Sequence, residues 1–255
     1  MRLLIIRHGE PDYEHDSLTE NGVKEAQALS DCLLKERIDD CYQSPLGRAR
    51  KTASYYLAAS GKTAETLDWL REFPARVQYK SDPELFRAMP TPWAAEPPDD
   101  RCVWDILPSH WCRHEEYYDD KAWRDSPIAR RSDMEAVYDA VCRGLDALLE
   151  RYGYVRDGRL YRVTRSDHRT AALFCHFGVG CVLISHLLGI SPFVLQQGLM
   201  ALPTSVTEIV TEEREKGIAA FRMLRYGDLS HLASAGIKPS FAGRYCECFE
   251  DKTRH

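Results

Sequence analysis

The chain has 255 residues, of which 44% are hydrophobic and 29% are charged. This length allows one large domain or two small ones, and the composition is typical of a soluble globular protein rather than a disordered one. A formal net charge of -5 argues against a general nucleic-acid or anionic-membrane binder, because both of these partners are negatively charged.

The cysteines and apolar runs favour a cytoplasmic protein. Nine cysteines are an odd number, and most stand singly in apolar stretches, which predicts buried reduced thiols rather than a disulfide framework. The apolar run Leu3–Ile6 is too short for a signal peptide. A longer run, Leu173–Ile190, contains His176 and His186, so a core strand followed by a buried helix is expected there rather than a membrane span.

The first part of the chain predicts alternating strands and helices. Arg2–Ile6 is a continuous apolar run, typical of a buried parallel strand, and a polar loop follows it. Thr19 is expected to cap a helix whose inner face carries Val23, Ala26, Leu29 and Leu33. A short strand over Asp39–Tyr42 comes next. Ser44 and Pro45 then predict a cap and a first helical proline, for a helix that runs to about Ala59.

The segment from Pro74 to Arg130 differs in composition from the rest. It holds eight of the thirteen prolines and four of the five tryptophans, and regular periodicity is absent from it. Such a stretch is too apolar for disorder, so we expect an irregular insertion that packs on the protein. Its aromatic residues include Phe86, Trp93, Trp104, Trp111, Tyr117 and Tyr118, and its carboxylates include Asp99, Asp100, Glu115, Glu116, Asp119 and Asp120.

The last third of the chain again predicts helices and strands. Ser132 and Glu135 have the spacing of a capping box, ahead of a long amphipathic helix that reaches Tyr152. Ala171–Cys175 reads as a buried strand, and a helix follows that stops near Gly189. Two late strands are expected, at Val206–Thr211 and Ile218–Leu224.

Four polar groups follow or flank predicted strands: Arg7-His8-Gly9, Arg48, Glu72 and His176. Open α/β sheets bind ligands at the carboxyl ends of their strands. Two arginines and two histidines converging there would form a cationic pocket suited to a phosphate dianion. An imidazole with an ordinary pKa of about 6.5 is a neutral nucleophile near pH 7. Gly9 would let the backbone approach the phosphate closely.

At these residues the chain resembles the histidine phosphatase superfamily, which contains cofactor-dependent phosphoglycerate mutase and many phosphatases. The resemblance rests on four blocks in the family's order. They are Arg7-His8-Gly9-Glu10, Leu18-Thr19-Glu20-Asn21-Gly22, Ser44-Pro45-Leu46-Gly47-Arg48-Ala49-Arg50-Lys51-Thr52-Ala53, and His176 after a late strand. The blocks cover roughly residues 1–73 and 132–224. One tripeptide alone would be weak, whereas four blocks in order are specific.

Together with the predicted elements, this resemblance implies an α/β fold, a three-layer α/β/α sandwich with a mostly parallel central sheet. Residues 1–255 would form a single phosphoglycerate mutase-like domain, with an inserted irregular subdomain at about 74–130. The insertion leaves the core directly after Glu72, so it is expected to cover the site and to set substrate choice. A homodimer interface is the alternative use of its aromatic residues.

The resemblance also implies a phosphohistidine mechanism. His8 would attack phosphorus, while Arg7, Arg48 and His176 hold the phosphoryl oxygens. Glu72 would protonate the leaving oxygen and later deprotonate water, with Glu84 or another acid of the insertion as the alternative. Neither a metal nor a cofactor is expected, because cationic side chains supply the electrostatic stabilisation.

Three residues are expected to border the pocket: Glu10, Thr19 and Phe177. Phe177 stands where the family usually has glycine, and it excludes the branch that carries an aspartate acid directly after the second histidine. Each role also has a structural alternative. Thr19 would then be a helix cap only, His176 a core histidine, and Arg48 a surface charge.

The function expected from this reading is hydrolysis of phosphomonoesters, with a small phosphorylated metabolite as substrate. A phosphoglycerate mutase-type transfer shares the first half-reaction and is the alternative. A non-catalytic protein that binds a phospholigand is a second alternative. The carboxylates of the insertion predict selection against polyphosphates.

Overall fold

The computed structural model describes residues 1–89 and 99–251. Its strands are β1 (Arg2–Arg7), β2 (Pro11–Asp12), β3 (Ser17–Leu18), β4 (Asp40–Gln43), β5 (Glu65–Thr66), β6 (Arg76–Gln78), β7 (Asp100–Cys102), β8 (Tyr154–Asp157), β9 (Leu160–Val163), β10 (Thr170–Cys175), β11 (Val206–Glu215) and β12 (Ile218–Asp228). Its helices are α1 (Glu20–Leu33), α2 (Gly47–Ser60), α3 (Pro83–Ala88), α4 (Pro108–Trp111), α5 (Pro127–Arg130), α6 (Met134–Arg151), α7 (Phe177–Leu188), α8 (Pro192–Gly198) and α9 (Ser230–Ala235). Four short 3-10 helices complete the set: η1 (Asp68–Leu70), η2 (Val103–Asp105), η3 (Glu115–Tyr118) and η4 (Ala122–Asp125).

A central sheet of eight strands organises the fold, in the order β5-β4-β10-β1-β11-β12-β9-β8. The strands β5, β4, β10 and β1 run parallel to one another, and β11, β12, β9 and β8 extend them in antiparallel fashion. The expected α/β fold is therefore confirmed, with its parallel strands together in one half of the sheet. The late strand pair is confirmed as well, and both of its strands are longer than predicted.

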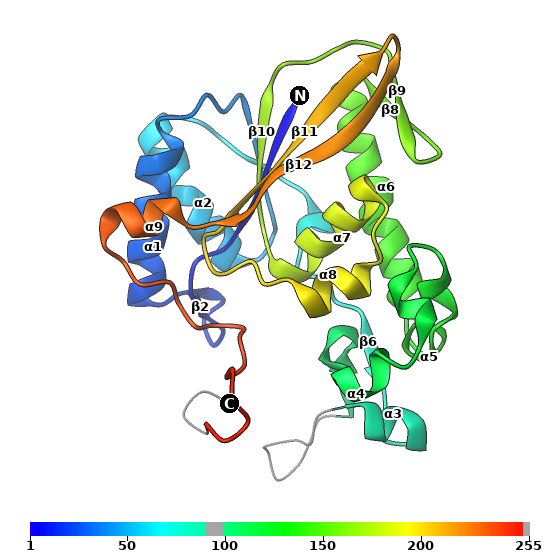
Figure 1. Cartoon of the computed structure of the whole chain (residues 1–255). Helices are drawn as coiled ribbons and strands as arrows, with labels where there is room; N and C mark the ends of the chain where they lie inside the picture. The colour runs from blue at the N-terminus through cyan, green and yellow to red at the C-terminus, as the bar shows by residue number, and fades with distance from the viewer. Residues whose placement is uncertain (90–98, 252–255) are drawn as a thin grey trace.

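Helices cover both faces of the sheet, as Figure 1 shows with α1, α2 and α9 on one side and α6 and α7 on the other. The alternation of side chains along β1 explains these layers, because successive residues of a strand point to opposite faces. Leu3 and Ile5 pack in the core that includes residues of α6 and α7, whereas Leu4 and Ile6 pack in the core with residues of α1 and α2. Both faces are apolar, which is why the strand reads as a continuous hydrophobic run.

Two predicted helix starts are wrong by one or two residues. The cap of α2 is Leu46, and the side chain of Ser44 is used elsewhere. The cap of α6 is Asp133, whose carboxylate accepts the backbone N–H of Arg76 instead of one from its own helix. The expected capping box does not form, because Glu135 pairs with Arg124.

The described parts of the segment 74–130 form short elements that pack into the larger hydrophobic core. Tyr117 and Trp123 are fully buried, with ring centroids 4.6 Å from Phe193 and 5.0 Å from Tyr138 respectively. Trp93, expected among the packing aromatics, lies outside the described residues. Several of the segment's carboxylates have cationic partners, in the pairs Asp99–Lys80, Asp100–Arg76 and Asp120–Arg159. These ion pairs neutralise part of the negative charge on which the predicted repulsion of polyphosphates depends.

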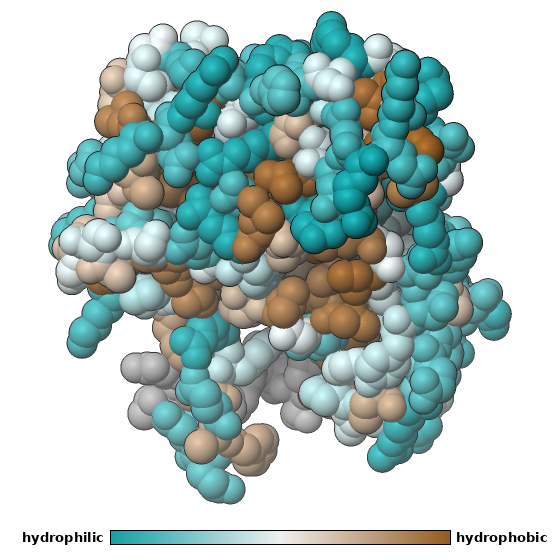
Figure 2. Space-filling view, turned by 45° about the horizontal axis from the view of Figure 1, so that its top comes forward, coloured by the Kyte–Doolittle hydropathy of each residue, from teal (hydrophilic) through white to brown (hydrophobic). Residues whose placement is uncertain are grey.

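The polarity of the surface and the burial of several cysteines agree with what the composition predicts. The face in Figure 2 is largely hydrophilic, with hydrophobic residues gathered near its centre. Within residues 1–89 and 99–251, every helix is too short or too polar to cross a bilayer. Cys142, Cys175 and Cys181 are buried free thiols, as expected, whereas Cys32, also expected to be buried, is only partly so.

Candidate active site

Three neighbouring parallel strands end at one place, and each is followed by a polar side chain. β1 pairs with β10 so that Arg7 lies opposite Cys175, and the next residues are His8 and His176. The backbone N–H of His8 donates to the Cys175 carbonyl at 3.0 Å, and the two imidazole centroids are 5.0 Å apart. Ser44 follows β4 in the same way, and its backbone N–H donates to Phe174 at 2.9 Å. The order of the strands thus brings the two predicted histidines together at one edge of the sheet.

His8 is held in one tautomer. Its Nδ1–H donates to the carbonyl oxygen of Gly9 at 2.7 Å, because a carbonyl can only accept. The lone pair is then on Nε2, which accepts a hydrogen bond from Nε–H of Arg48 at 3.4 Å. The side chain is only 2% exposed. Burial, followed by the charge of Arg7, lowers the pKa of His8 to about 3, so the ring is neutral near pH 7.

The backbone around His8 is fixed from both sides. The carbonyl of His8 accepts the N–H of Thr204 at 3.1 Å, and the N–H of Gly9 donates to Thr52 Oγ1 at 3.0 Å. Thr204 has a φ of 58°, a left-handed conformation that is unfavourable for a β-branched residue. Gly9 has a packing reason for lacking a side chain, since an added Cβ would lie 2.8 Å from the carbonyl oxygen of Gly22. Strain and close approach are therefore concentrated beside the imidazole.

His176 is oriented by Ser44. Ser44 Oγ lies 2.7 Å from Nε2 of His176, and both side chains are buried. The other ring nitrogen, Nδ1, is buried and has no hydrogen-bond partner within the part of the chain that the structure describes. Burial lowers the pKa of His176, and the neighbouring His8 lowers it further. If Ser44 donates to Nε2, then Nδ1 carries the proton and is left available to donate to a ligand oxygen.

Arg48 is held by Asp16, a residue that carries no motif in the sequence. Arg48 Nη1 lies 2.7 Å from Asp16 Oδ1, and the N–H of Gly47 donates to Oδ2 at 2.6 Å. Although burial alone would raise it, these bonds hold the pKa of the Asp16 carboxyl below its ordinary value. Gly47 is needed here, because a Cβ would lie 2.2 Å from the Asp16 carbonyl oxygen. Asp16 thus fixes both the arginine and the start of α2.

Arg7 points into the protein at the end of β1. Its Nη1 donates to the carbonyl of Ala201 at 2.6 Å, and its guanidinium carbon lies 5.8 Å from the ring centre of Phe177. Its Nε is buried and unpartnered among the described residues. Gly243, in the segment after α9, lies against the guanidinium, since an added Cβ would be 2.9 Å from Nη2. Phe177 therefore lies beside Arg7, an arginine that is predicted to bind phosphate. This position agrees with the border of the pocket, where Phe177 is expected.

Glu72 lies at the amino end of α7, next to His176 in space. Its Oε1 accepts the N–H of Phe73 at 2.8 Å and that of Val179 at 3.3 Å. Burial raises the pKa of the Glu72 carboxyl, against the opposing effects of these hydrogen bonds and of Arg7. A raised pKa suits a group that must first give a proton and then take one.

Gly178 allows this arrangement and brings the insertion close to it. An added Cβ at Gly178 would lie 2.8 Å from Glu72 Oε1 and 2.8 Å from Cζ3 of Trp104. Trp104 belongs to the segment 74–130, and its carbonyl accepts Nε2 of Gln197. The insertion therefore comes close to the predicted acid at the indole of Trp104.

The other predicted residues, Glu10, Thr19 and Glu84, are bound to neighbouring side chains. Both carboxylate oxygens of Glu10 are occupied, one by Thr19 Oγ1 at 2.8 Å and the other by Asn21 Nδ2 at 3.0 Å. Thr19 also caps α1 by accepting the N–H of Gly22. Glu84, the alternative acid, pairs with Arg131 on the insertion. The structure therefore brings together His8, Arg7, Arg48, His176 and Glu72, and gives Glu10 and Thr19 a part in anchoring α1.

Sequence reasoning missed Ser44 and Asp16 as positioning residues. Ser44 lies inside a recognised block, but the Ser-Pro pair has the pattern of a helix cap, and that pattern concealed its contact with His176. Asp16 has no local signal, because its partner is 32 residues away in the sequence.

Comparison with known proteins shows what the chain is similar to. The family described as histidine phosphatase superfamily (branch 1) matches residues 3–104, which include Arg7, His8, Arg48 and Glu72. The resemblance to the histidine phosphatase superfamily that the sequence predicts is therefore confirmed over residues 3–104. No curated protein matches the chain.

Solved structures share the fold across most of their length. A mutant phosphoserine phosphatase from Entamoeba histolytica, in complex with phosphoserine, matches with a TM-score of 0.58 and 16% identity, over 91% of this chain and 98% of that one. A mycobacterial glucosyl-3-phosphoglycerate phosphatase matches with a TM-score of 0.55 and 18% identity, over 89% and 98%. A putative alpha-ribazole-5'-P phosphatase from Escherichia coli matches with 0.53 and 19%, over 90% and 98%. These identities are low, so the comparison establishes the fold alone.

Proposed function

We propose that this protein hydrolyses small phosphomonoesters through a phosphohistidine at Nε2 of His8. The observation that carries the proposal is the state of His8 itself. The ring is buried and neutral, its Nδ1–H donates to Gly9, and its Nε2 lone pair accepts a long hydrogen bond from Arg48, a predicted phosphate-binding residue. A nucleophile needs an available lone pair, and this one becomes available when Arg48 turns from Nε2 to a phosphoryl oxygen.

In the first half-reaction, Nε2 of His8 attacks phosphorus, and a P–N bond forms as the bond to the leaving oxygen breaks. Arg48, Arg7 and Nδ1 of His176 would bind the three non-bridging oxygens, where negative charge is concentrated. The unpartnered Nδ1 of His176 and Nε of Arg7 support this role, because both are buried polar atoms without a partner among the described residues. Glu72, protonated at this stage, gives its proton to the leaving oxygen.

In the second half-reaction, water attacks the phosphorus of phospho-His8. Glu72, now ionised, takes a proton from this water, the P–N bond breaks, and its electron pair returns to Nε2. Inorganic phosphate leaves and the starting state is restored. The same carboxyl acts as acid and then as base, which its raised pKa favours.

A small phosphorylated metabolite is the substrate class we propose. The proteins of similar fold are named for phosphoserine, glucosyl-3-phosphoglycerate and alpha-ribazole-5'-P, which share one phosphate ester on a small organic body. The part of the substrate beyond the phosphate would contact Trp104, because this indole packs beside Glu72 at Gly178. The insertion would then select the substrate, as its place after Glu72 in the chain leads us to expect.

Turnover of a generic aryl phosphate tests the proposal. Wild-type protein should release phosphate, and His8→Ala should lose essentially all of this activity. His168→Ala is the matched control, since His168 is exposed and lies outside the site. A wild-type protein that binds phosphate without releasing any from esters would instead support the non-catalytic alternative. Phosphoryl transfer to an added alcohol in preference to water would support the mutase alternative.

A further inference from the structure

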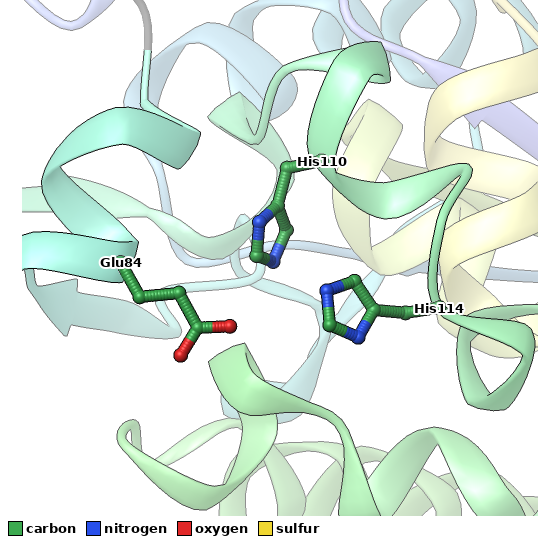
Figure 3. Close-up of side chains that lie close together, drawn as sticks. All are labelled: Glu84, His110 and His114. Atoms are coloured by element: carbon green, nitrogen blue, oxygen red, sulfur yellow. The ribbon is translucent and has the colours of Figure 1, made fainter.

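A second cluster of chemistry-bearing side chains lies in the insertion, outside the site described above. Glu84 on α3, His110 on α4 and His114 just after α4 each offer one ligand atom, and these atoms lie within 4.8 Å of one another. Figure 3 shows the carboxylate and the two imidazole rings turned toward a common space. All three side chains are partly buried, so an ion entering from solvent can reach them.

His110 has an unused ring nitrogen. Its Nε2 is buried and has no hydrogen-bond partner within residues 1–89 and 99–251. Burial lowers the pKa of the imidazole, which therefore stays neutral, and a neutral imidazole keeps a lone pair on one nitrogen. Buried polar atoms normally have a partner, so the position calls for a ligand.

His114 also has one ring nitrogen that is available to a ligand. Its Nδ1 lies 3.4 Å from Oε1 of Glu116, which leaves Nε2 for another partner. A carboxylate on the second nitrogen is the usual support of a metal-binding histidine, because it fixes the ring and makes the free nitrogen more basic. The rings of His110 and His114 are only 4.5 Å apart between centroids, a spacing that two protonated imidazoles would oppose.

We propose that Glu84, His110 and His114 bind one divalent transition-metal ion, of which Zn²⁺ fits best. Two imidazole nitrogens and one carboxylate oxygen are typical zinc ligands, whereas Ca²⁺ and Mg²⁺ prefer oxygen alone. Bonds of about 2.0–2.1 Å in a tetrahedron place ligand atoms about 3.4 Å apart, so the three side chains must close by roughly 1 Å. Water would take the fourth position.

Arg131 is the competitor of the ion. Its Nη1 lies 3.1 Å from Oε2 of Glu84, and its Nε lies 2.9 Å from Asp82. A guanidinium at this distance opposes a dication, which makes the affinity lower than in a dedicated zinc site. Removing this charge by Arg131→Ala should therefore strengthen zinc binding, a direction opposite to that expected for the ligand variants.

The ion would join two elements that are weak alone. α3 has six residues and α4 has four, and helices this short are not stable without other contacts. A metal bridge between them would stabilise the insertion by binding only the folded form. It is not part of the proposed chemistry at His8, so aryl phosphate turnover should persist after the ion is removed with EDTA.

Equilibrium dialysis of the metal-free full chain against Zn²⁺ tests the site. Wild-type protein should bind one ion that His110→Ala and His114→Ala both lose, while His168→Ala keeps it. Glu84→Gln should bind about 10-fold more weakly or worse, and Arg131→Ala more tightly. With Co²⁺ as probe, the wild-type protein should show the visible absorption of a tetrahedral site, and Zn²⁺ should raise its melting temperature.

Two results would overturn the proposal. One is equal zinc binding by the wild-type, His110→Ala and His114→Ala proteins, which would assign the ion to other groups such as the exposed Cys112. The other is no binding and no change in melting temperature in the wild-type protein. If the alanine variants fail to fold, as judged by circular dichroism, Glu84→Gln and Arg131→Ala decide the question, because neither removes a buried ring.

Discussion

Ser44 Oγ lies 2.7 Å from Nε2 of His176, and this contact decides which nitrogen of the second histidine faces the pocket. The serine is a positioning residue, because it acts on the phosphate through His176. Its hydroxyl also accepts the backbone N–H of Leu46 at 3.2 Å, and it still has a proton to donate to Nε2 of His176. The loop between β4 and α2 therefore supplies a hydrogen-bond partner to a histidine that follows another strand.

Ser44→Ala should lower kcat/KM for an aryl phosphate about 10-fold, because His176 would no longer be held with Nδ1–H toward the phosphate. Ser54→Ala, on the exposed side of α2, is the control and should have no effect. Steady-state kinetics and a phosphate or vanadate inhibition constant would measure both variants. Unchanged kinetics in Ser44→Ala would show that the contact does not position the histidine.

Asp16→Asn should weaken catalysis by about 10-fold, since the amide keeps the shape but removes the charge that holds Arg48. Arg48→Ala should cost on the order of 100-fold or more, because the phosphate contact itself is lost. Combining the two changes should cost little more than Arg48→Ala alone, as expected for residues that act through one another. Asp12→Asn, in the same loop, pairs with His15 instead and is the matched control. Additive losses in the double variant would argue against the anchoring role.

The stability of the protein should fall as the pH drops below about 6.5. The folded state holds the pKa of His8 at about 3, whereas the unfolded chain binds this proton near 6.5. Between these values the unfolded state carries more protons, so stability decreases as the pH falls, by at most about 1.4 kcal/mol per pH unit for each such histidine. His176 acts in the same direction. Urea unfolding at several pH values should give a flatter dependence for His8→Asn than for the wild-type protein, and parallel curves would refute the assignment.

Trp104→Ala should change substrate ranking more than it changes turnover of a small aryl phosphate. The indole packs at Gly178 beside Glu72, where the organic part of a substrate would lie. Deleting the whole insertion is a poor test, because Tyr117 and Trp123 are buried in the core of the domain. A panel of phosphorylated metabolites, compared with Trp111→Ala as control, would show the shift. If both variants keep the wild-type ranking and lose only a dimeric state, the insertion is an interface.

The parallel half of the sheet and the main site residues could be predicted because their signals are local. The run Arg2–Ile6, the capping by Thr19 and the position of His176 after a buried strand each depend on a few adjacent residues. The hairpin of β8 and β9 was missed, since its strands have four residues each and one of them is half polar. Ser44 and Asp16 could not be assigned for another reason. Their partners are distant in sequence, and their nearest patterns indicate a helix cap and a loop.

The structure of the insertion could also be predicted only in part. Its composition predicts packing, which Tyr117 and Trp123 confirm, but its elements have only three to six residues and carry no periodicity. The grouping of Glu84 with His110 and His114 depends on how α3 and α4 meet, and no spacing rule connects residues of two such short helices.

Trapping the covalent intermediate is the most direct test of the central claim. The wild-type protein, mixed with a phosphomonoester and quenched rapidly in base, should carry one phosphate on His8, identified by mass spectrometry of the peptide that contains it. The label should be stable to base, labile to acid, and absent from His8→Ala. Label that survives in His8→Ala, or that lies on a serine or an aspartate of the wild-type protein, would contradict the phosphohistidine account.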